Sequence, residues 1–292
     1  MTASEAEPAR KDEATALYLD LLKGCLTRDL FPEQEVIDIT WWREGDFYDT
    51  PEAVWEVLRP HGWRLVRRPD PRTDQRHGLA FPLHAETMVG RDRLDNVQSI
   101  VETVLDEAIG GDIVETGVWR GGTVIFMRAL LKAYGVLDRT VWVCDSFQGL
   151  PEPDPTRYPH DETMQIDDAG TRSMFDGLLS VPADTVRANF ARYGLLDDQV
   201  RFLEGWFSDT LPDAPIEQIA VLRLDGDLYE STMDALVNLE PRVAPGGFVV
   251  VDDYGSIGAC QQAVTDYREQ HGIDDEIHIV DWTGAYWRKG GA

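Results

Sequence analysis

Carboxylates close two β-rich runs in the C-terminal half of the chain, and their types and spacing suit metal chemistry. One run ends in Asp225-Gly226-Asp227, and the next ends in Asp252-Asp253. Because neighbouring strands of a doubly wound sheet deliver their C-terminal ends to the same crevice, three or four carboxylates should meet there. Such a cluster repels itself unless it is protonated or neutralised, and an all-oxygen set suits Mg²⁺ or a similar hard cation. We therefore expect Asp225, Asp252 and Asp253 to bind a metal ion; acids that only form turns are the alternative.

A glycine-containing turn follows the first strand of the same region. Its sequence is Glu115-Thr116-Gly117-Val118-Trp119-Arg120-Gly121-Gly122. Glycines allow a sharp turn and the close approach of a ligand, but this spacing is not the GxGxxG that supports a pyrophosphate, so a dinucleotide is disfavoured. An acid at the strand end with a glycine two residues later is typical of sites for S-adenosylmethionine, whose ammonium or hydroxyl groups it can bind. We expect cofactor contacts from Glu115, Gly117, Trp119, Arg120 and Gly121, with a tight turn that binds no ligand as the alternative.

Two further strand ends could complete a pocket for an adenosine group. Asp145 and Ser146 follow the second strand, where a carboxylate can accept hydrogen bonds from both ribose hydroxyls. A helix N-cap is the alternative role for Asp145. After the third strand, Trp206 within Gly205-Trp206-Phe207-Ser208 predicts an aromatic wall for the adenine, with core packing as the alternative.

A mostly parallel sheet is needed to bring these residues together, and the chain beyond residue 111 alternates β-rich and helical patterns. The predicted strands are 112–116, 140–145, 200–204, 220–225 and 247–252. The predicted helices are 94–108, 123–134, 184–193, 231–239 and 257–270. This alternation indicates right-handed βαβ crossovers and a Rossmann-like α/β fold. Two last runs, 276–280 and 285–288, predict a terminal antiparallel hairpin, which is an unusual end for a nucleotide-type sheet.

The upstream part of the chain predicts a helical accessory segment. Apolar residues between Ala16 and Leu22 indicate an amphipathic helix that stops near Gly24 and packs on its own subunit or on a neighbouring one. Arginines between Arg59 and Arg76 form a basic island, expected to be a solvated face or a partner for acidic surface, or else a grip on an acidic substrate group. Prolines and acids over 151–172 predict a long loop, either a lid beside the second strand or a merely mobile segment.

The composition excludes several classes of protein. Among 292 residues, 53 acidic and 27 basic side chains give a net charge of −26, which disfavours binding to nucleic acids and to anionic membrane surfaces. Cys25, Cys144 and Cys260 are far apart and form no CxxC pair, so neither a disulfide framework nor a zinc ribbon is expected. The first residues lack the features of a signal peptide, and no apolar run approaches about 20 residues, so we expect a cytoplasmic protein.

Taken in order, the motifs resemble those of the macrocin and mycinamicin sugar O-methyltransferase family. Besides the turn after the first strand, the resemblance rests on Asp145-Ser146-Phe147-Gln148-Gly149, Arg192-Tyr193-Gly194-Leu195, Gly205-Trp206-Phe207, Leu224-Asp225-Gly226-Asp227 and the run from Pro245-Gly246-Gly247-Phe248 through Asp252-Asp253-Tyr254. It spans about residues 86–288 and implies an S-adenosylmethionine-dependent domain over 86–292, behind an accessory segment over 1–85 that shapes the acceptor pocket. It implies that Thr87, Met88, Glu115, Gly117, Asp145, Ser146 and Trp206 bind the cofactor, and that Asp225, Asp252 and Asp253 bind Mg²⁺.

Enzymes of that family methylate a deoxysugar hydroxyl on an antibiotic scaffold, and the resemblance implies the same reaction here. We expect an in-line transfer in which the metal lowers the pKa of the attacking hydroxyl. Asp225, which also borders the cofactor, is the first candidate to take the proton, and His160 in the lid is the second. Asp227 is expected to support the metal ligands or to cap the helix that begins near Ser231. The resemblance also suggests a homodimer or a larger symmetric assembly, and it leaves the sugar and the aglycone open.

Three other functions remain open from the sequence. A catechol or polyphenol O-methyltransferase would use the same metal chemistry on a vicinal aromatic diol. An NAD-dependent dehydrogenase is disfavoured because the GxGxxG spacing is missing. A binding domain without catalysis would not need three convergent carboxylates.

Overall fold

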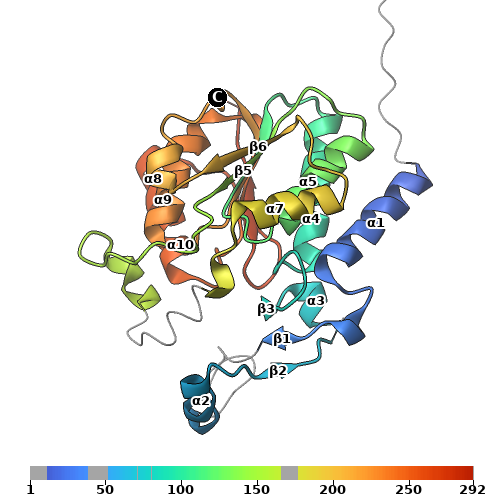
Figure 1. Cartoon of the computed structure of the whole chain (residues 1–292). Coiled ribbons are helices and arrows are strands. Elements are labelled where there is room, and N and C mark those ends of the chain that lie inside the picture. Colours follow the sequence, from blue (N-terminus) through green and yellow to red (C-terminus); the bar gives the residue numbers. More distant parts are fainter. Residues whose placement is uncertain (1–11, 39–51, 71, 80, 166–176, 292) are drawn as a thin grey trace, which may run out of the picture.

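The computed structural model describes residues 12–38, 52–70, 72–79, 81–165 and 177–291, and a sheet with helices on both sides forms its centre (Figure 1). Within these residues the main sheet has seven strands, in the order β6-β5-β4-β7-β8-β10-β9. They are β4 (Asp112–Thr116), β5 (Val141–Asp145), β6 (Val200–Glu204), β7 (Ile219–Leu224), β8 (Val243–Val251), β9 (His278–Ile279) and β10 (Ala285–Arg288). Strands β4 to β8 are parallel, whereas β10 pairs antiparallel with β8 and β9. The predicted Rossmann-like sheet with its C-terminal antiparallel hairpin is confirmed.

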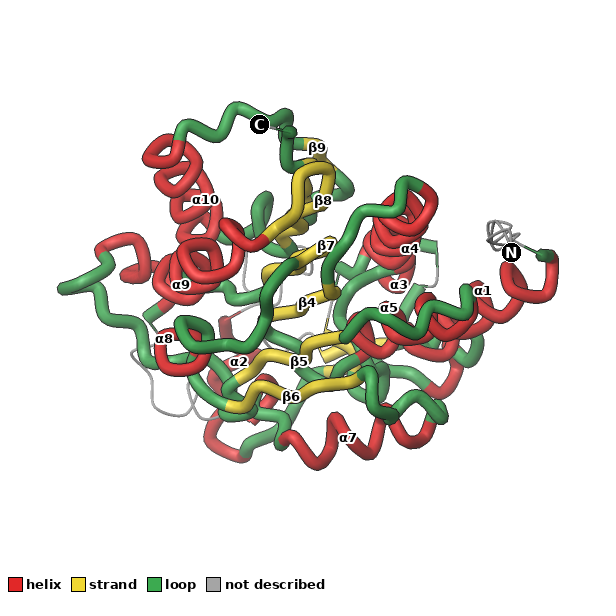
Figure 2. The backbone as a smooth tube through the Cα atoms, turned by 90° about the horizontal axis from the view of Figure 1, so that it is seen from above, coloured by secondary structure: helices red, strands yellow, loops and turns green. Residues whose placement is uncertain are grey.

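Helices cover both faces of the sheet, as the view from above shows (Figure 2). One face carries α4 (Arg91–Asp106), α5 (Gly122–Ala133) and α7 (Ala183–Arg192); the other carries α8 (Phe207–Thr210), α9 (Tyr229–Leu239), η4 (Glu240–Arg242) and α10 (Gly258–His271). Each face buries its own apolar cluster, and adjacent residues of one strand divide between them: Ile113 belongs to the first cluster and Val114 to the second. No described helix combines the length and the apolar character that crossing a membrane requires.

The N-terminal helix α1 (Glu13–Thr27) runs one turn beyond its predicted end. The prediction that it stops near Gly24 is wrong, because Leu26 belongs to the buried core and keeps the last turn packed. Gly24 serves a different purpose. A Cβ at this position would lie 2.7 Å from atoms of Asp29 and Leu30, so the glycine lets the chain fold back closely after the helix.

A small antiparallel sheet of order β2-β1-β3 lies apart from the main sheet (Figure 1). Its region contains η1 (Pro32–Gln34), β1 (Ile37–Asp38), α2 (Glu52–Leu58), η2 (Arg59–His61), β2 (Val66–Arg67), α3 (Asp74–His77) and β3 (Phe81–Pro82). Three arginines of the basic island form ion pairs within the chain: Arg64 with Asp38 at 3.4 Å, Arg67 with Asp74 at 2.5 Å and Arg76 with Asp92 at 3.2 Å. These ion pairs support the interpretation that the basic island is a partner for acidic side chains of the same chain. The division of the chain at residue 85 stays a prediction.

The predicted lid contains regular structure where a loop is predicted. Residues 159–164 form a 3-10 helix, η3 (Pro159–Met164), whereas 166–172 lie outside the described residues. The buried carboxylate of Asp161 accepts hydrogen bonds from the backbone N–H groups of Tyr229 (2.6 Å) and Glu230 (3.2 Å) at the start of α9. A carboxylate at this position satisfies donors that a helix leaves free at its N-terminus. Asp161 therefore caps α9, and the expectation that Asp227 would do so is wrong.

Candidate functional site

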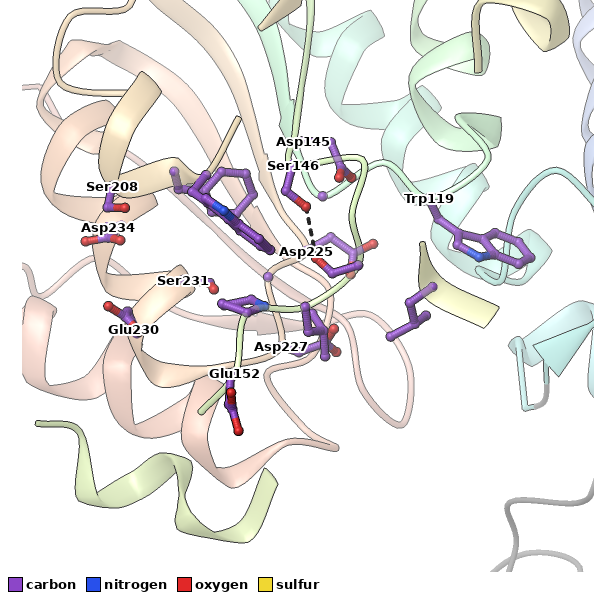
Figure 3. A pocket seen from close by; sticks show the side chains of 18 of the residues that line it. Trp119, Asp145, Ser146, Glu152, Ser208, Asp225, Asp227, Glu230, Ser231 and Asp234 are labelled. Carbon is purple, nitrogen blue, oxygen red and sulfur yellow. Dashed lines mark hydrogen bonds between the residues drawn. The ribbon is translucent and has the colours of Figure 1, made fainter. Parts of the chain in front are cut away.

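The carboxyl ends of the parallel strands border two adjoining cavities. The larger, of about 390 Å³, is lined by residues that follow β4, β5, β6 and β7 and by the first two turns of α9 (Figure 3). The smaller, of about 220 Å³, is lined by residues that follow β7 and β8 together with parts of the accessory region and of the C-terminal hairpin. Among the described residues, five line both cavities: Met88, Trp119, Leu179, Asp225 and Asp227. Two molecules bound side by side would therefore meet at these residues.

Gly117 allows the ends of β4 and β7 to lie against each other. Its φ is +80°, and a Cβ at this position would lie only 1.6 Å from the carbonyl oxygen of Asp225. The backbone N–H of Gly117 donates to Cys144 O at 2.8 Å, and the N–H of Asp225 donates to Thr116 O at 2.8 Å. Because only glycine fits here, this turn fixes the position of Asp225 at the boundary of the two cavities.

Of the other predicted cofactor residues in this turn, Trp119 lines the cavities, whereas Arg120 supports a neighbouring segment. Trp119 lines both cavities, and its indole N–H donates to Leu178 O at 2.9 Å. Arg120 and Gly121, predicted as cofactor contacts, do not line either cavity among the described residues. The Arg120 guanidinium instead donates to the carbonyl oxygens of residues 83 and 85, both at 2.8 Å, and lies 4.1 Å from the Trp119 ring centroid. Arg120 thus holds the segment that leads into the predicted cofactor residues 87 and 88.

Asp145 joins the turns that follow β4 and β5. Its two carboxylate oxygens accept hydrogen bonds from the backbone N–H groups of Val118 (2.7 Å) and Phe147 (2.6 Å). Burial raises the pKa of Asp145, although these backbone hydrogen bonds act against that rise. Neither amide belongs to a helix N-terminus, so the alternative role of Asp145 as a helix N-cap does not apply. Asp145, Ser146 and Trp206 all line the larger cavity, and their contacts with adenosine stay predictions.

Glu115, Thr87 and Met88 border the smaller cavity, and Met88 also borders the larger one. The Thr87 hydroxyl lies 3.2 Å from that of Thr123 and accepts from the N–H of Val89 at 3.2 Å. Glu115 is buried at the end of β4, where burial raises its pKa to about 8. Its Oε2 is buried and has no hydrogen-bond partner among the described residues.

The predicted metal ligands come together as the strand order requires. One oxygen from each of Asp225, Asp252 and Asp253 lies within 4.8 Å of the others. Asp253 Oδ2 is buried and lacks a hydrogen-bond partner within the described part of the chain. An all-carboxylate set with an unsatisfied buried oxygen suits a hard cation such as Mg²⁺.

Two buried arginines, which the sequence analysis missed, compensate much of this negative charge. Arg223, whose side chain is 2% exposed, contacts Glu115 Oε1 at 2.5 Å and Asp225 Oδ2 at 2.9 Å, and it also pairs with Asp252 Oδ1. Arg93 contacts the other oxygen of Asp252 at 2.5 Å. A charged side chain in the apolar run of β7 could have been noticed, because a central parallel strand is buried on both faces and any charge there must be paired.

Compensation by arginine is uneven across the cluster. Burial alone would raise the pKa of Asp252, but Arg223 and Arg93 hold it below its usual range. Burial and the charge of Asp252 raise the pKa of Asp225 to about 6, despite Arg223. Burial and the neighbouring acids raise the pKa of Asp227 to about 7 and that of Asp253 well above its usual value. Asp227 and Asp253 are therefore the carboxylates with the greatest tendency to bind a proton or a cation.

The two predicted proton acceptors lie in different environments. Asp225 lines both cavities, but it is paired with Arg223. His160 lies on η3 and stacks on Tyr229 with a ring-centroid distance of 5.3 Å; it does not line either cavity among the described residues. Asp227 lines both cavities and has a φ of +57°, a left-handed conformation that is uncommon for a residue with a side chain and that often marks a functional position.

Several lining residues had no sequence signal. The first two turns of α9 bring Glu230 and Asp234 to the larger cavity, as Figure 3 shows. Leu79, Met164 and Trp282 reach the smaller cavity from the accessory region, from η3 and from the hairpin. They are separated by about 80 to 200 residues along the chain, so only the folded structure brings them together.

Comparisons with known proteins agree with this geometry. A family model described as Macrocin-O-methyltransferase (TylF) matches residues 15–289. The chain is 50% identical over 277 residues to the 8-demethyl-8-(2,3-dimethoxy-alpha-L-rhamnosyl)-tetracenomycin-C 4'-O-methyltransferase of Streptomyces olivaceus, covering 95% of this chain and 94% of that protein. It is 52% identical over 214 residues to the mycinamicin III 3''-O-methyltransferase of Micromonospora griseorubida, covering 73% and 82%. The solved structure of the O-methyltransferase NovP matches with a TM-score of 0.77 and 42% identity, covering 95% of this chain and 100% of that one.

Proposed function

Because the chain belongs to the macrocin O-methyltransferase family and is therefore an S-adenosylmethionine-dependent O-methyltransferase, we propose that it methylates a sugar hydroxyl of a glycosylated antibiotic-type natural product with the help of Mg²⁺. The observation that carries this proposal is the junction of the two cavities. One cavity is large enough for a cofactor, and the other combines a metal-type carboxylate cluster with an apolar wall. The shared residues Asp225 and Asp227 lie where a methyl donor and an acceptor hydroxyl would meet.

The larger cavity would hold S-adenosylmethionine, which supplies an activated methyl group. Asp145 and Ser146 border it after β5, and Trp206 provides an aromatic surface after β6. Trp119 borders both cavities and is anchored through Leu178, so it helps to fix the boundary between donor and acceptor. Precise positioning of this kind can account for a large part of the rate of a group transfer, on the order of 7–11 kcal/mol.

Asp225, Asp252 and Asp253 would hold Mg²⁺, which lowers the pKa of a bound hydroxyl when it is present. Arg223 and Arg93 fix Asp252 from two sides, so that this ligand keeps one geometry. Asp253 retains the unsatisfied oxygen, which makes it the ligand with most to gain from a cation.

Asp227 is the best-placed acceptor for the proton of the sugar hydroxyl. It borders both cavities, and burial raises its pKa to about 7, close to the value that suits a general base. Asp225 is less suitable because it pairs with Arg223, and His160 is outside both linings among the described residues. Asp227→Asn should lower kcat by about 10²–10⁴-fold and change the Kd for S-adenosylmethionine far less, with exposed Asp213→Asn as the matched control. An active Asp227→Asn variant would remove this role.

The charge of the site favours a neutral acceptor. The larger cavity is lined by the carboxylates of Asp145, Glu152, Asp225, Asp227, Glu230 and Asp234, and its described lining contains no cation. Among the described residues that line the smaller cavity, Arg93 is the one cation, and it is already paired with Asp252 and Asp281. A nucleoside diphosphate sugar would bring further negative charge to this acidic lining, whereas a neutral glycoside would not.

A methyl-transfer assay with three acceptors tests the proposal. A neutral deoxysugar glycoside, the corresponding nucleoside diphosphate sugar and a catechol are incubated with S-adenosylmethionine, with Mg²⁺ or with chelator, and products are followed by mass spectrometry. We expect Mg²⁺-dependent methylation of the glycoside. Methylation of the catechol alone would favour a polyphenol enzyme, and calorimetric binding of NAD in place of S-adenosylmethionine would overturn the assignment altogether.

A further inference from the structure

Trp282 lines the smaller cavity, as does Trp119. It lies in the turn between β9 and β10, and its indole N–H donates to the carbonyl oxygen of His77 at 2.8 Å. This hydrogen bond joins the C-terminal hairpin to the accessory region. Trp282 therefore lies where two segments about 200 residues apart close over the cavity.

The neighbours of Trp282 fix it relative to the metal-type carboxylates. Asp281 contacts Arg93 at 3.1 Å, and Arg93 in turn contacts Asp252. On the other side, the Thr283 hydroxyl donates to the backbone carbonyl of Asp252 at 2.9 Å. The residues on both sides of Trp282 are thus tied to Asp252, so the indole has a defined place in the cavity.

The lining of this cavity has two chemical characters. Its described lining includes the carboxylates of Asp225, Asp252 and Asp253, and it also includes apolar side chains, here called the apolar part, among them Trp282, Leu79, Met164, Leu179 and Ile257. Its volume of about 220 Å³ is below the roughly 300–1,000 Å³ of pockets that enclose drug-sized ligands. It therefore has room for one sugar ring rather than for a complete glycoside. A ring whose hydroxyls contact the carboxylates must place its C–H groups against the apolar part.

We infer that Trp282 determines the sugar specificity of the enzyme. Its indole packs on the C–H face of the acceptor sugar, and with Leu79 it selects sugars that carry a methyl group in place of a hydroxymethyl group. An additional hydroxyl against this wall would lose its hydrogen bonds to water without gaining a partner. This inference rests on the proposed function and names the feature of the sugar that the site recognises.

The test compares an α-L-rhamnoside with the α-L-mannoside of the same aglycone, which differs by one hydroxyl. We expect the wild type to favour the rhamnoside by about 10- to 100-fold in kcat/KM. Trp282→Ala should bring this ratio close to one. Trp282→Phe, which keeps an aromatic face but loses the hydrogen bond to His77, should retain the preference. Trp63→Ala is the matched control, because Trp63 is exposed and lies outside the described linings of both cavities.

Melting temperature and the Kd for S-adenosylmethionine are measured for each variant, since a structural role alone would change these values and not the ratio. Leu79→Asn provides a second test with Trp282 intact. Its amide would offer a hydrogen-bond partner to the additional hydroxyl of the mannoside, so the rhamnoside-to-mannoside ratio of kcat/KM should decrease. A folded Trp282→Ala or Leu79→Asn variant that keeps the wild-type ratio overturns the inference. If the wild type methylates neither glycoside, the proposed function fails and the inference fails with it.

Discussion

Replacing Arg223 by methionine should lower the free energy of unfolding by about 3–5 kcal/mol at pH 8, because this change removes one side of a buried ion-pair network. Arg223 contacts three carboxylates, and its own side chain and that of Glu115 are each 2% exposed. Asp252 keeps Arg93 as a partner, whereas Glu115 forms no second ion pair among the described residues and would lose its charged partner while still buried.

The loss should depend on pH in a defined direction. Burial already raises the pKa of Glu115 to about 8, and the removal of Arg223 would raise it further above the value in the unfolded chain. A raised folded-state pKa contributes stability at low pH that is lost as the pH rises through that pKa. Glu115 is protonated below pH 8 in both proteins, so its share of the loss develops above pH 8. Between pH 6 and pH 8 the loss grows through Asp225, whose pKa of about 6 would rise without Arg223. The effect of Arg223→Met should accordingly be smaller at pH 6 than at pH 8.

Differential scanning calorimetry measures this effect. A loss of 3–5 kcal/mol corresponds to a decrease in Tm of roughly 6–20 °C for a chain of this size class. Arg201→Met is the matched control, because Arg201 is exposed on the edge strand β6 and should change stability by no more than about 0.5 kcal/mol. If Arg223→Met and Arg201→Met have the same Tm at pH 8, the carboxylates are neutral in the native enzyme and Arg223 does not compensate them.

Three further predictions follow from the site. Gly117→Ala should abolish S-adenosylmethionine binding in calorimetry, because its Cβ would overlap the Asp225 carbonyl oxygen. The control Gly135→Ala, with φ +68° and no atom within 4 Å, should lower the free energy of unfolding by only about 1–2 kcal/mol. Normal binding by Gly117→Ala would contradict this packing. Burial and nearby acids raise the pKa of Asp225 and Asp253, so the Tm measured in chelator should decrease from pH 6 to pH 8. Mg²⁺ should then raise the Tm more at pH 8 than at pH 6. An equal rise in Tm at both pH values would argue against Mg²⁺ replacing those protons. Asp161→Ala should lose about 0.5–2 kcal/mol in urea unfolding through loss of the α9 cap, and an unchanged midpoint would show that this cap is unimportant.

The carboxylate cluster was predictable because it depends only on strand ends. Parallel strands that lie side by side must end at one edge, so acids placed directly after β7 and β8 have to meet. The alternation of strands and helices along the chain and the glycine turn after β4 follow from similarly local patterns. None of these inferences needed to know which side chain contacts which.

The features that the sequence did not predict depend on contacts between distant segments. Asp161 caps a helix that begins 68 residues later, and its own segment carries several other acids with equal claim to such a role. Arg120 lies within the cofactor turn, yet its side chain supports residues 83 and 85 instead of lining a cavity. Position in a motif constrains the backbone closely but leaves the direction of a long side chain free.

Trp282 is an intermediate case, since the topology explains its place once the hairpin is known. Strand β10 runs antiparallel to β8, and their register pairs Ala285 with Val251. The turn before β10 must then lie at the same edge as the residues that follow β8, which are Asp252 and Asp253. In a sheet that ended with another parallel strand, the residues preceding that strand would lie at the opposite edge, away from the carboxylates. The antiparallel end of the sheet is therefore what allows a C-terminal side chain to form a wall of the acceptor cavity.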